Sequence, residues 1–188
     1  MTSGRISVTM CGVMDCMESE AICCAFTGHR DRKLPWGDDE TDSRCETLKR
    51  GIYDAAEALW LHAGVRHFIC GMARGADLYF CEAILALRSE HPEITLEAAI
   101  PCEEQSRNWP EALRRRYDRL VSECDYVTVI SKSFTPDCML LRNRYMVDRC
   151  GYLIAAYNGS PGGTRATLLY ALRQGRQIIQ LPMEDSKA

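Results

Sequence analysis

Three glycine-containing turns combine residues that can bind a phosphate group. They occupy residues 27–30, 71–77 and 162–164 and read TGHR, GMARGAD and GGT. Each follows a short apolar run, and the last two lead directly into a stretch with helical periodicity. Glycine lets the backbone approach a ligand closely, while the free amides and the dipole at a helix start attract negative charge. The sequence therefore predicts a phosphate site that includes Gly28, Gly71, Gly75, Gly162 and Gly163.

Side chains within the turns extend this predicted site. His29 and Arg30 carry hydrogen-bond donors, and Arg74 can form a bidentate, charge-assisted bond to phosphate. Thr164 can either cap its helix or bind a phosphate oxygen. Asp77 has two interpretations, because an acidic residue at a helix start also complements the helix dipole without any ligand.

Four further residues near expected strand ends are suited to hold a base and a ribose phosphate. Gln105 and Trp109 follow the third expected strand, whereas Arg142 and Asn143 follow the fourth. Each has a structural alternative, since Trp109 can pack in the core and Arg142 can lie on a solvated helix face. The complete set of predicted ligand-binding residues is Gly28, His29, Arg30, Gly71, Ala73, Arg74, Gly75, Asp77, Gln105, Trp109, Arg142, Asn143, Gly162, Gly163 and Thr164.

Candidates for catalysis are fewer. His29, Asp77 and Glu104 are titratable groups near strand ends that can act as an acid or a base. Cys102 also stands at a strand end, but no histidine neighbours it in the sequence, so we interpret it as structural. Neither a GxGxxG nor a Walker A loop occurs, which disfavours an NAD enzyme and a P-loop NTPase.

The elements that must position these residues alternate along the chain. The expected strands are 21–27, 67–70, 95–100, 126–130, 152–156 and 177–180, and the expected helices are 41–63, 76–89, 108–122, 139–148 and 164–174. This alternation predicts an α/β, Rossmann-like single domain over residues 21–182, with a mostly parallel sheet and helices on both faces. Ligands bind beyond the carboxyl ends of such strands. The irregular stretch 30–40 is either a ligand-covering loop or a surface connection.

Composition limits the classes of partner. The 188 residues have a formal net charge of −3, so no global positive field attracts nucleic acid or an anionic membrane. No signal peptide or membrane-spanning run is evident. The eleven cysteines lie without a CxxC pair, which predicts mostly buried, reduced thiols and no metal site. We therefore expect a cytoplasmic protein without metal or cofactor, with residues 1–20 as an extension that can be disordered and 183–188 as a tail.

The ordered set of motifs resembles the SLOG superfamily. The motifs are CAFTGHR at 24–30 with KLP at 33–35, GMARGAD at 71–77, IPC at 100–102 with Gln105 and Trp109, RNRYMVD at 142–148, and GGTRAT at 162–167. Within the superfamily, the sequence is similar to the YpsA/YoqJ-like family of bacterial proteins over residues 21–182. The superfamily also contains DprA, LOG phosphoribohydrolases and sensor domains for ADP-ribose-like signals. The resemblance implies a Rossmann-like fold and nucleotide binding at these turns.

Three functions remain open on these grounds. The first is binding or sensing of a nucleotide-derived ligand, either a nucleoside phosphate or an ADP-ribose-like molecule. The second is LOG-like N-glycosidic cleavage, but residues 161–170 lack the second Gly-Thr step and the glutamate of the LOG pattern Pro-Gly-Gly-x-Gly-Thr-x-x-Glu. The third, single-stranded DNA binding of the DprA kind, is disfavoured by an acidic chain with 8% aromatic residues. Pairing through helices leaves a homo-oligomer open.

Overall fold

The computed structural model describes residues 23–183. The expected extension at 1–20, the first two residues of the first expected strand and all but one residue of the expected tail lie outside the described residues. Six strands form one sheet: β1 (Cys23–Gly28), β2 (His67–Cys70), β3 (Thr95–Ile100), β4 (Tyr126–Val129), β5 (Tyr152–Ala156) and β6 (Gln177–Leu181). The strand order is β4-β3-β2-β1-β5-β6, and every neighbouring pair is parallel.

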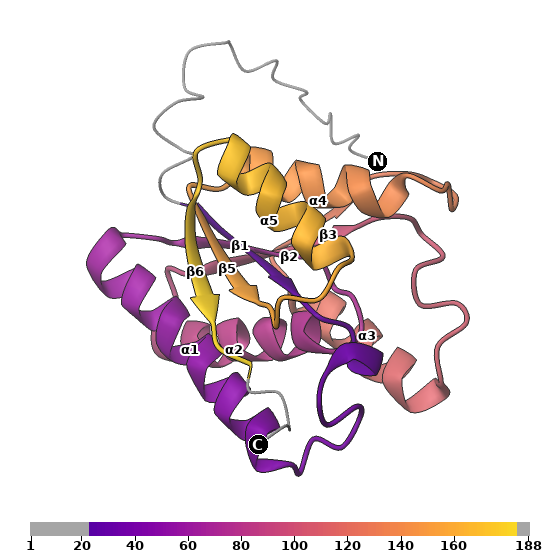
Figure 1. The fold of residues 1–188 in the computed structure, drawn as a ribbon, viewed down its shortest axis with the longest axis horizontal. Coiled ribbons are helices and arrows are strands. Elements are labelled where there is room, and N and C mark those ends of the chain that lie inside the picture. Colours follow the sequence, from indigo (N-terminus) through magenta and orange to yellow (C-terminus); the bar gives the residue numbers. More distant parts are fainter. Residues whose placement is uncertain (1–22, 184–188) are drawn as a thin grey trace, which may run out of the picture.

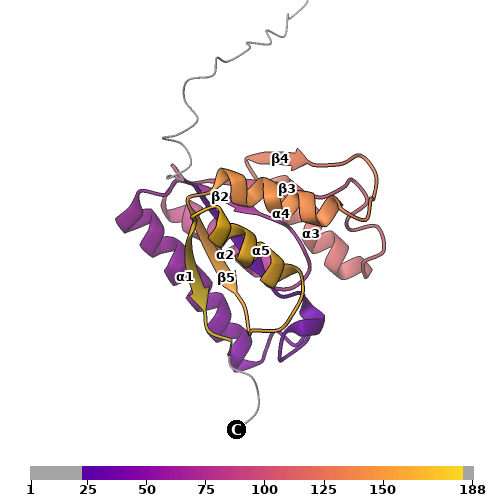
Figure 2. The same ribbon diagram turned by 45° about the horizontal axis from the view of Figure 1, so that its top comes forward.

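Five α-helices connect these strands: α1 (Ser43–Ala63), α2 (Ala76–Glu90), α3 (Glu111–Glu123), α4 (Cys138–Arg149) and α5 (Gly163–Arg173). α1, α2 and α3 cover one face of the sheet, and α4 and α5 cover the other (Figures 1 and 2). The predicted Rossmann-like architecture is therefore confirmed, because each helix crosses between two parallel strands and the chain reverses its direction of travel at β1.

Sequence pattern explains the two layers. In α1, the residues Leu48, Ile52, Ala56 and Leu59 recur at helical spacing and are buried, and the helix ends at Gly64, whose φ of 71° lies in the left-handed region. The larger core packs beneath α1–α3, where the rings of Phe26 and Phe80 stack with centroids 4.7 Å apart. A smaller core lies beneath α4 and α5 and is built from residues such as Met146, Val147, Leu153 and Leu168.

The irregular stretch after β1 is anchored rather than loose. A short 3-10 helix, Asp31–Lys33, is followed by Leu34 and Trp36, whose side chains are buried in the larger core. Seven of the nine described cysteines are buried, as expected from their apolar surroundings, and the other two are half-buried. Within residues 23–183, no helix is long and apolar enough to cross a bilayer.

Candidate functional site

A cavity of about 330 Å³ opens where the strand order reverses, beyond the carboxyl ends of β1 and β5. Gly28 pairs in register with Ala156, so the loops that leave the two strands start at the same level and separate toward opposite faces. This crevice is the usual ligand position in open parallel sheets. The cavity is lined by ten predicted residues: Gly28, His29, Arg30, Ala73, Asp77, Arg142, Asn143, Gly162, Gly163 and Thr164.

The remaining predicted residues lie outside this cavity. Arg74 forms an ion pair with Asp31 and lines a second hollow of about 310 Å³ together with Gly75. The side-chain amide of Gln105 donates to the carbonyl of Met72, and Trp109 packs edge-on against Tyr117 with ring centroids 5.2 Å apart. Gly71 lies behind the cavity wall, and the catalytic candidate Glu104 pairs with Arg107 at the exposed surface.

The glycines of the GMARGAD turn make room for the protein's own atoms. A Cβ on Gly75, where φ is 87°, would stand 2.5 Å from the backbone nitrogen of Asp31. The amide of Ala76, at the start of α2, already donates to the carbonyl of His29 over 3.1 Å. A Cβ on Gly71 would collide with the guanidinium of Arg142. This turn therefore fastens the loop after β1 and admits an arginine.

A buried ion pair forms one wall of the cavity. Asp77 and Arg142 are each 5% exposed, and the Asp77 Oδ2 lies 3.6 Å from the Arg142 Nη1. The same carboxylate oxygen accepts a bond from the Ala73 amide (3.1 Å), while Arg142 donates to the carbonyl of Gly71. Burial raises the pKa of the Asp77 carboxyl against the opposing effect of Arg142, and burial lowers the pKa of Arg142. Burial thus disfavours the charged forms of both side chains, while hydrogen bonds to the backbone of the 71–77 turn hold them in place.

The start of α5 differs from that of α2 in what its backbone amides meet. Within residues 23–183 no side chain caps either helix, but the first amide of α2 donates to the carbonyl of His29, whereas the first amides of α5 form no such bond and are left for another acceptor. A Cβ on Gly163 would have no neighbour within 4 Å. The Thr164 hydroxyl donates to the carbonyl of Gly28 over 3.0 Å, which fixes the helix start against the end of β1. The open helix end therefore lies at the edge of the cavity.

Basic side chains from the loop after β1 complete the rim. Arg30, Arg32 and Lys33 line the cavity, and none of them forms an ion pair with a carboxylate within residues 23–183. Lys33 reaches across to the opposite loop, where its Nζ donates to the carbonyl of Pro161 over 2.6 Å. His29 is buried below the rim and its Nε2 forms a 2.7 Å hydrogen bond with Asn158 Oδ1. Two loops far apart in sequence are joined at these points.

Sequence reasoning missed six residues of the lining: Phe26, Thr27, Arg32, Lys33, Met139 and Met146. Two signals were available for some of them. Lys33 belongs to the KLP motif that follows the first turn. Met139 and Met146 share a helical face with Arg142 and Asn143, because they are spaced at three- and four-residue steps. Asn143 is held on that face by a 2.8 Å bond from its Nδ2 to Thr167 Oγ1.

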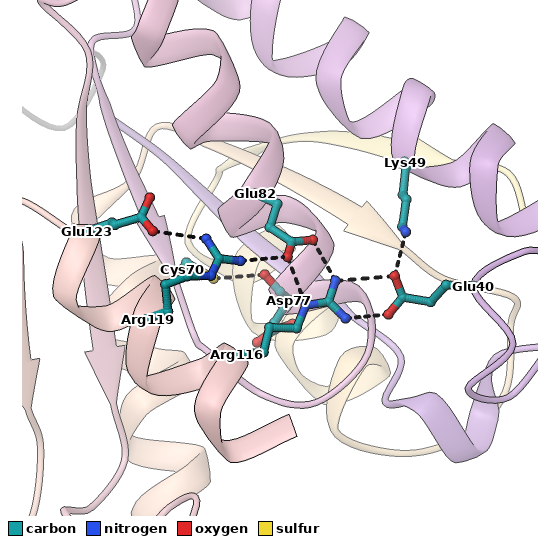
Figure 3. A network of polar contacts seen from close by, with 8 residues as sticks. All are labelled: Glu40, Lys49, Cys70, Asp77, Glu82, Arg116, Arg119 and Glu123. Atoms are coloured by element: carbon teal, nitrogen blue, oxygen red, sulfur yellow. Dashed lines mark hydrogen bonds and ion pairs between the residues drawn. The ribbon is translucent and has the colours of Figure 1, made fainter. Parts of the chain in front are cut away.

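The second hollow has a different electrostatic character. Its wall contains Arg116, whose guanidinium is shared between Glu40 and Glu82, and Lys49 also donates to Glu40 (Figure 3). Burial alone would lower the pKa of Arg116 and raise the pKa of Glu40. These interactions outweigh burial, so the pKa of Arg116 is raised and the pKa of Glu40 is lowered. The cations of this hollow are already neutralised by the protein. In contrast, the cations of the first cavity, together with the open helix end, form a site suited to an anion.

Comparisons with known proteins identify relatives of the sequence and neighbours of the fold. The prophage-derived protein YoqJ of Bacillus subtilis is 30% identical over 148 residues, which are 71% of this chain and 86% of YoqJ. DNA processing protein A from Streptococcus pneumoniae superposes with a TM-score of 0.59 at 19% identity, over 87% of this chain and 51% of that protein. This chain thus spans about half the length of that protein.

The corresponding protein from Helicobacter pylori, which binds single-stranded DNA, gives a TM-score of 0.61 at 18% identity, over 94% of this chain and 72% of that protein. Identities at this level show a shared fold and leave the ligand open. The family model YpsA, described as the YspA SLOG family, matches residues 24–183. The match covers all six strands except Cys23 and includes both sides of the cavity, and the chain therefore belongs to the YspA SLOG family.

Proposed function

We propose that this protein binds a nucleotide-derived ligand, either a nucleoside phosphate or an ADP-ribose-like molecule, in the cavity beyond β1 and β5. The observation that carries the proposal is the convergence of Arg30, Arg32 and Lys33 with the uncapped start of α5 on one cavity. Each of these groups attracts an anion, and phosphate matches both the fork of an arginine and the amides of a helix start.

The interior of the cavity supports a ligand that is larger than phosphate. Met139 and the buried Phe26 and Met146 line the cavity with apolar groups, while Asn143 adds an amide. A pocket with a few polar groups at fixed places and apolar walls is typical of small-molecule sites. Membership of a SLOG family supports a nucleotide-related ligand for such a pocket.

Cleavage of an N-glycosidic bond is the second candidate, because one carboxyl group, that of Asp77, lines the cavity with a raised pKa. A carboxyl of this kind can protonate a leaving group. Its hydrogen bond from Ala73 and its ion pair with Arg142 favour the structural interpretation over the catalytic one. The two interpretations differ in one measurable product, the free base.

Calorimetric titration with AMP, ADP and ADP-ribose tests the proposal directly. We expect binding by the wild type and a loss of about 10- to 150-fold in affinity for Arg32→Ala, as for other charge-assisted hydrogen bonds. Arg114→Ala is the matched control, because Arg114 is exposed on α3 and lines neither hollow. Equal affinities in all three proteins, or no binding of any of the nucleotides, would contradict the proposal.

Two parallel assays separate the other functions. Release of free adenine from AMP by the wild type would move the assignment to a hydrolase, and Asp77→Asn should then abolish that release. An electrophoretic shift of an oligothymidine at low and high salt measures single-stranded DNA binding. Tight DNA binding without nucleotide binding would favour the DprA-like alternative.

A further inference from the structure

Charge is divided unequally along the chain. Residues 23–125 contain fourteen Lys and Arg against nineteen Asp and Glu, whereas residues 126–183 contain seven Lys and Arg against two Asp. Within the described residues, every ion pair except that of Asp77 with Arg142 joins side chains in the range 31–125. Among residues 23–183, the arginines of α4 and α5 other than Arg142 thus form no ion pair with a carboxylate.

Exposed apolar side chains gather in the same part of the molecule. Among the described residues, all the large exposed hydrophobic side chains except Leu61 fall between 126 and 172. Four of them are leucines on α4 and α5: Leu140, Leu141, Leu169 and Leu172, which are 42–61% exposed. Single exposed leucines are ordinary, but a cluster of them beside cations that form no ion pair with any described carboxylate is typical of an interaction surface.

These residues form one continuous face. α4 and α5 lie side by side over the sheet in both views (Figures 1 and 2). Across their junction, the guanidinium of Arg144 stands 5.5 Å from the ring centre of Tyr170, whose hydroxyl donates to Asp148 over 2.8 Å. We define the α4–α5 face as Leu140, Leu141, Arg144, Leu169, Leu172 and Arg173. Their spacing of one, three or four residues places each helix's contribution on its outer stripe.

We propose that the α4–α5 face docks an acidic, amphipathic segment of a partner protein. Leucine anchors require apolar groups on the partner, which the phosphates of nucleic acid do not provide. A second copy docking through the same face would bring together two surfaces of the same positive charge, and like charges at an interface oppose association. An acidic segment with a leucine stripe matches both the charge and the apolar side chains of this face.

The probe for this proposal is a labelled synthetic helical peptide with leucines on one face and glutamates on the others. A second peptide has lysine in place of every glutamate. Fluorescence anisotropy of each peptide is measured against the full chain over a range of salt concentrations. We expect the acidic peptide to bind, with an affinity that falls as salt rises, and the basic peptide not to bind.

Matched variants locate the binding. Leu169→Ser with Leu172→Ser, and separately Arg144→Glu with Arg173→Glu, should each weaken the acidic peptide by roughly tenfold or more. The controls are Leu61→Ser, which removes a leucine as exposed (61%) as Leu172, and Arg114→Glu on α3. Far-UV circular dichroism confirms that each variant folds. Because none of these residues lines the cavity, nucleotide titration of the same variants should match the wild type.

Four results would overturn the proposal. They are no binding of the acidic peptide, equal binding of both peptides, equal effects of the face variants and the controls, and loss of nucleotide affinity in the face variants. Two further measurements test other occupants. Binding to vesicles of anionic phospholipid that the leucine variants abolish, without peptide binding, would assign the face to a membrane. Concentration-dependent sedimentation that the same variants abolish would assign it to a second copy.

Discussion

The two glycine-rich turns that precede α2 and α5 look alike in sequence and differ in what they approach. At residues 71–77, Gly71 admits the Arg142 guanidinium and Gly75 admits the backbone of the loop after β1. At residues 162–164, a Cβ on Gly162 would meet only the flexible end of the Lys33 side chain and a Cβ on Gly163 would meet nothing within 4 Å; among residues 23–183, no carbonyl of another loop accepts from the first amides of α5. A glycine at such a turn therefore indicates that another group approaches the backbone closely. The neighbouring elements decide whether that group belongs to the protein or to a ligand.

This difference predicts that substitutions in the first turn act on stability and those in the second on binding. The largest effect is expected for Asp77→Asn, because it leaves the buried guanidinium of Arg142 without its counter-ion. Breaking a buried pair in this way costs about 3–5 kcal/mol of the free energy of unfolding. Urea denaturation measures it, and Glu111→Gln, which breaks the exposed pair with Arg115, is the control and should change stability by no more than about 1 kcal/mol.

Gly75→Ala should have the next largest effect. Strain at its backbone angles (φ 87°, ψ −131°) and collision with the Asp31 backbone together cost about 2–4 kcal/mol. Gly64→Ala is the milder reference, because Gly64 lies in the left-handed region (φ 71°, ψ 17°) and a Cβ there would meet no atom within 4 Å. Thermal and urea unfolding should therefore show a smaller loss for Gly64→Ala. Equal losses would mean that neither the backbone angles of Gly75 nor its approach to the loop after β1 adds to the cost of an ordinary left-handed glycine.

A pH titration tests the hydrogen bond by which Tyr145 on α4 is held to Glu97 on β3. Burial alone would raise the pKa of Glu97, but hydrogen bonds from His67 and Tyr145 outweigh it and lower the pKa to about 2. A carboxyl with a lowered folded pKa stabilises the protein above its unfolded pKa and loses this contribution as pH falls. Glu97→Gln should therefore flatten the stability loss between about pH 4.5 and 2, by at most about 3 kcal/mol. An unchanged acid limb in urea denaturation would refute this role.

The smallest effect on stability is expected in the second turn. Gly163→Val should change the free energy of unfolding by no more than about 1 kcal/mol, since valine has a better helix propensity than glycine and meets open space. Its affinity for the nucleotide should fall, because a branched side chain at the cavity edge blocks close approach to the helix amides. Calorimetry and thermal melts of the same sample check both statements. A strong loss of stability would remove the contrast between the two turns.

The sequence by itself determined the order and type of the elements. Apolar runs of strand length alternate with helical stripes such as Leu48, Ile52 and Leu59, and parallel strands joined by helices have few alternative arrangements. It also placed the polar turns at one edge of the sheet, because the carboxyl ends of parallel strands share that edge. These conclusions depend on local periodicity and on handedness, which a single sequence contains.

Only the tertiary structure decided which residues of those turns face the cavity. Arg74 and Arg32 are both arginines close to a glycine turn, yet Arg74 pairs with Asp31 while Arg32 lines the cavity without a carboxylate partner among the described residues. The direction of a side chain depends on which loop packs behind it, and that loop comes from another part of the sequence. Contacts between distant segments, such as Lys33 with Pro161, fix those directions and leave no periodic trace in the chain.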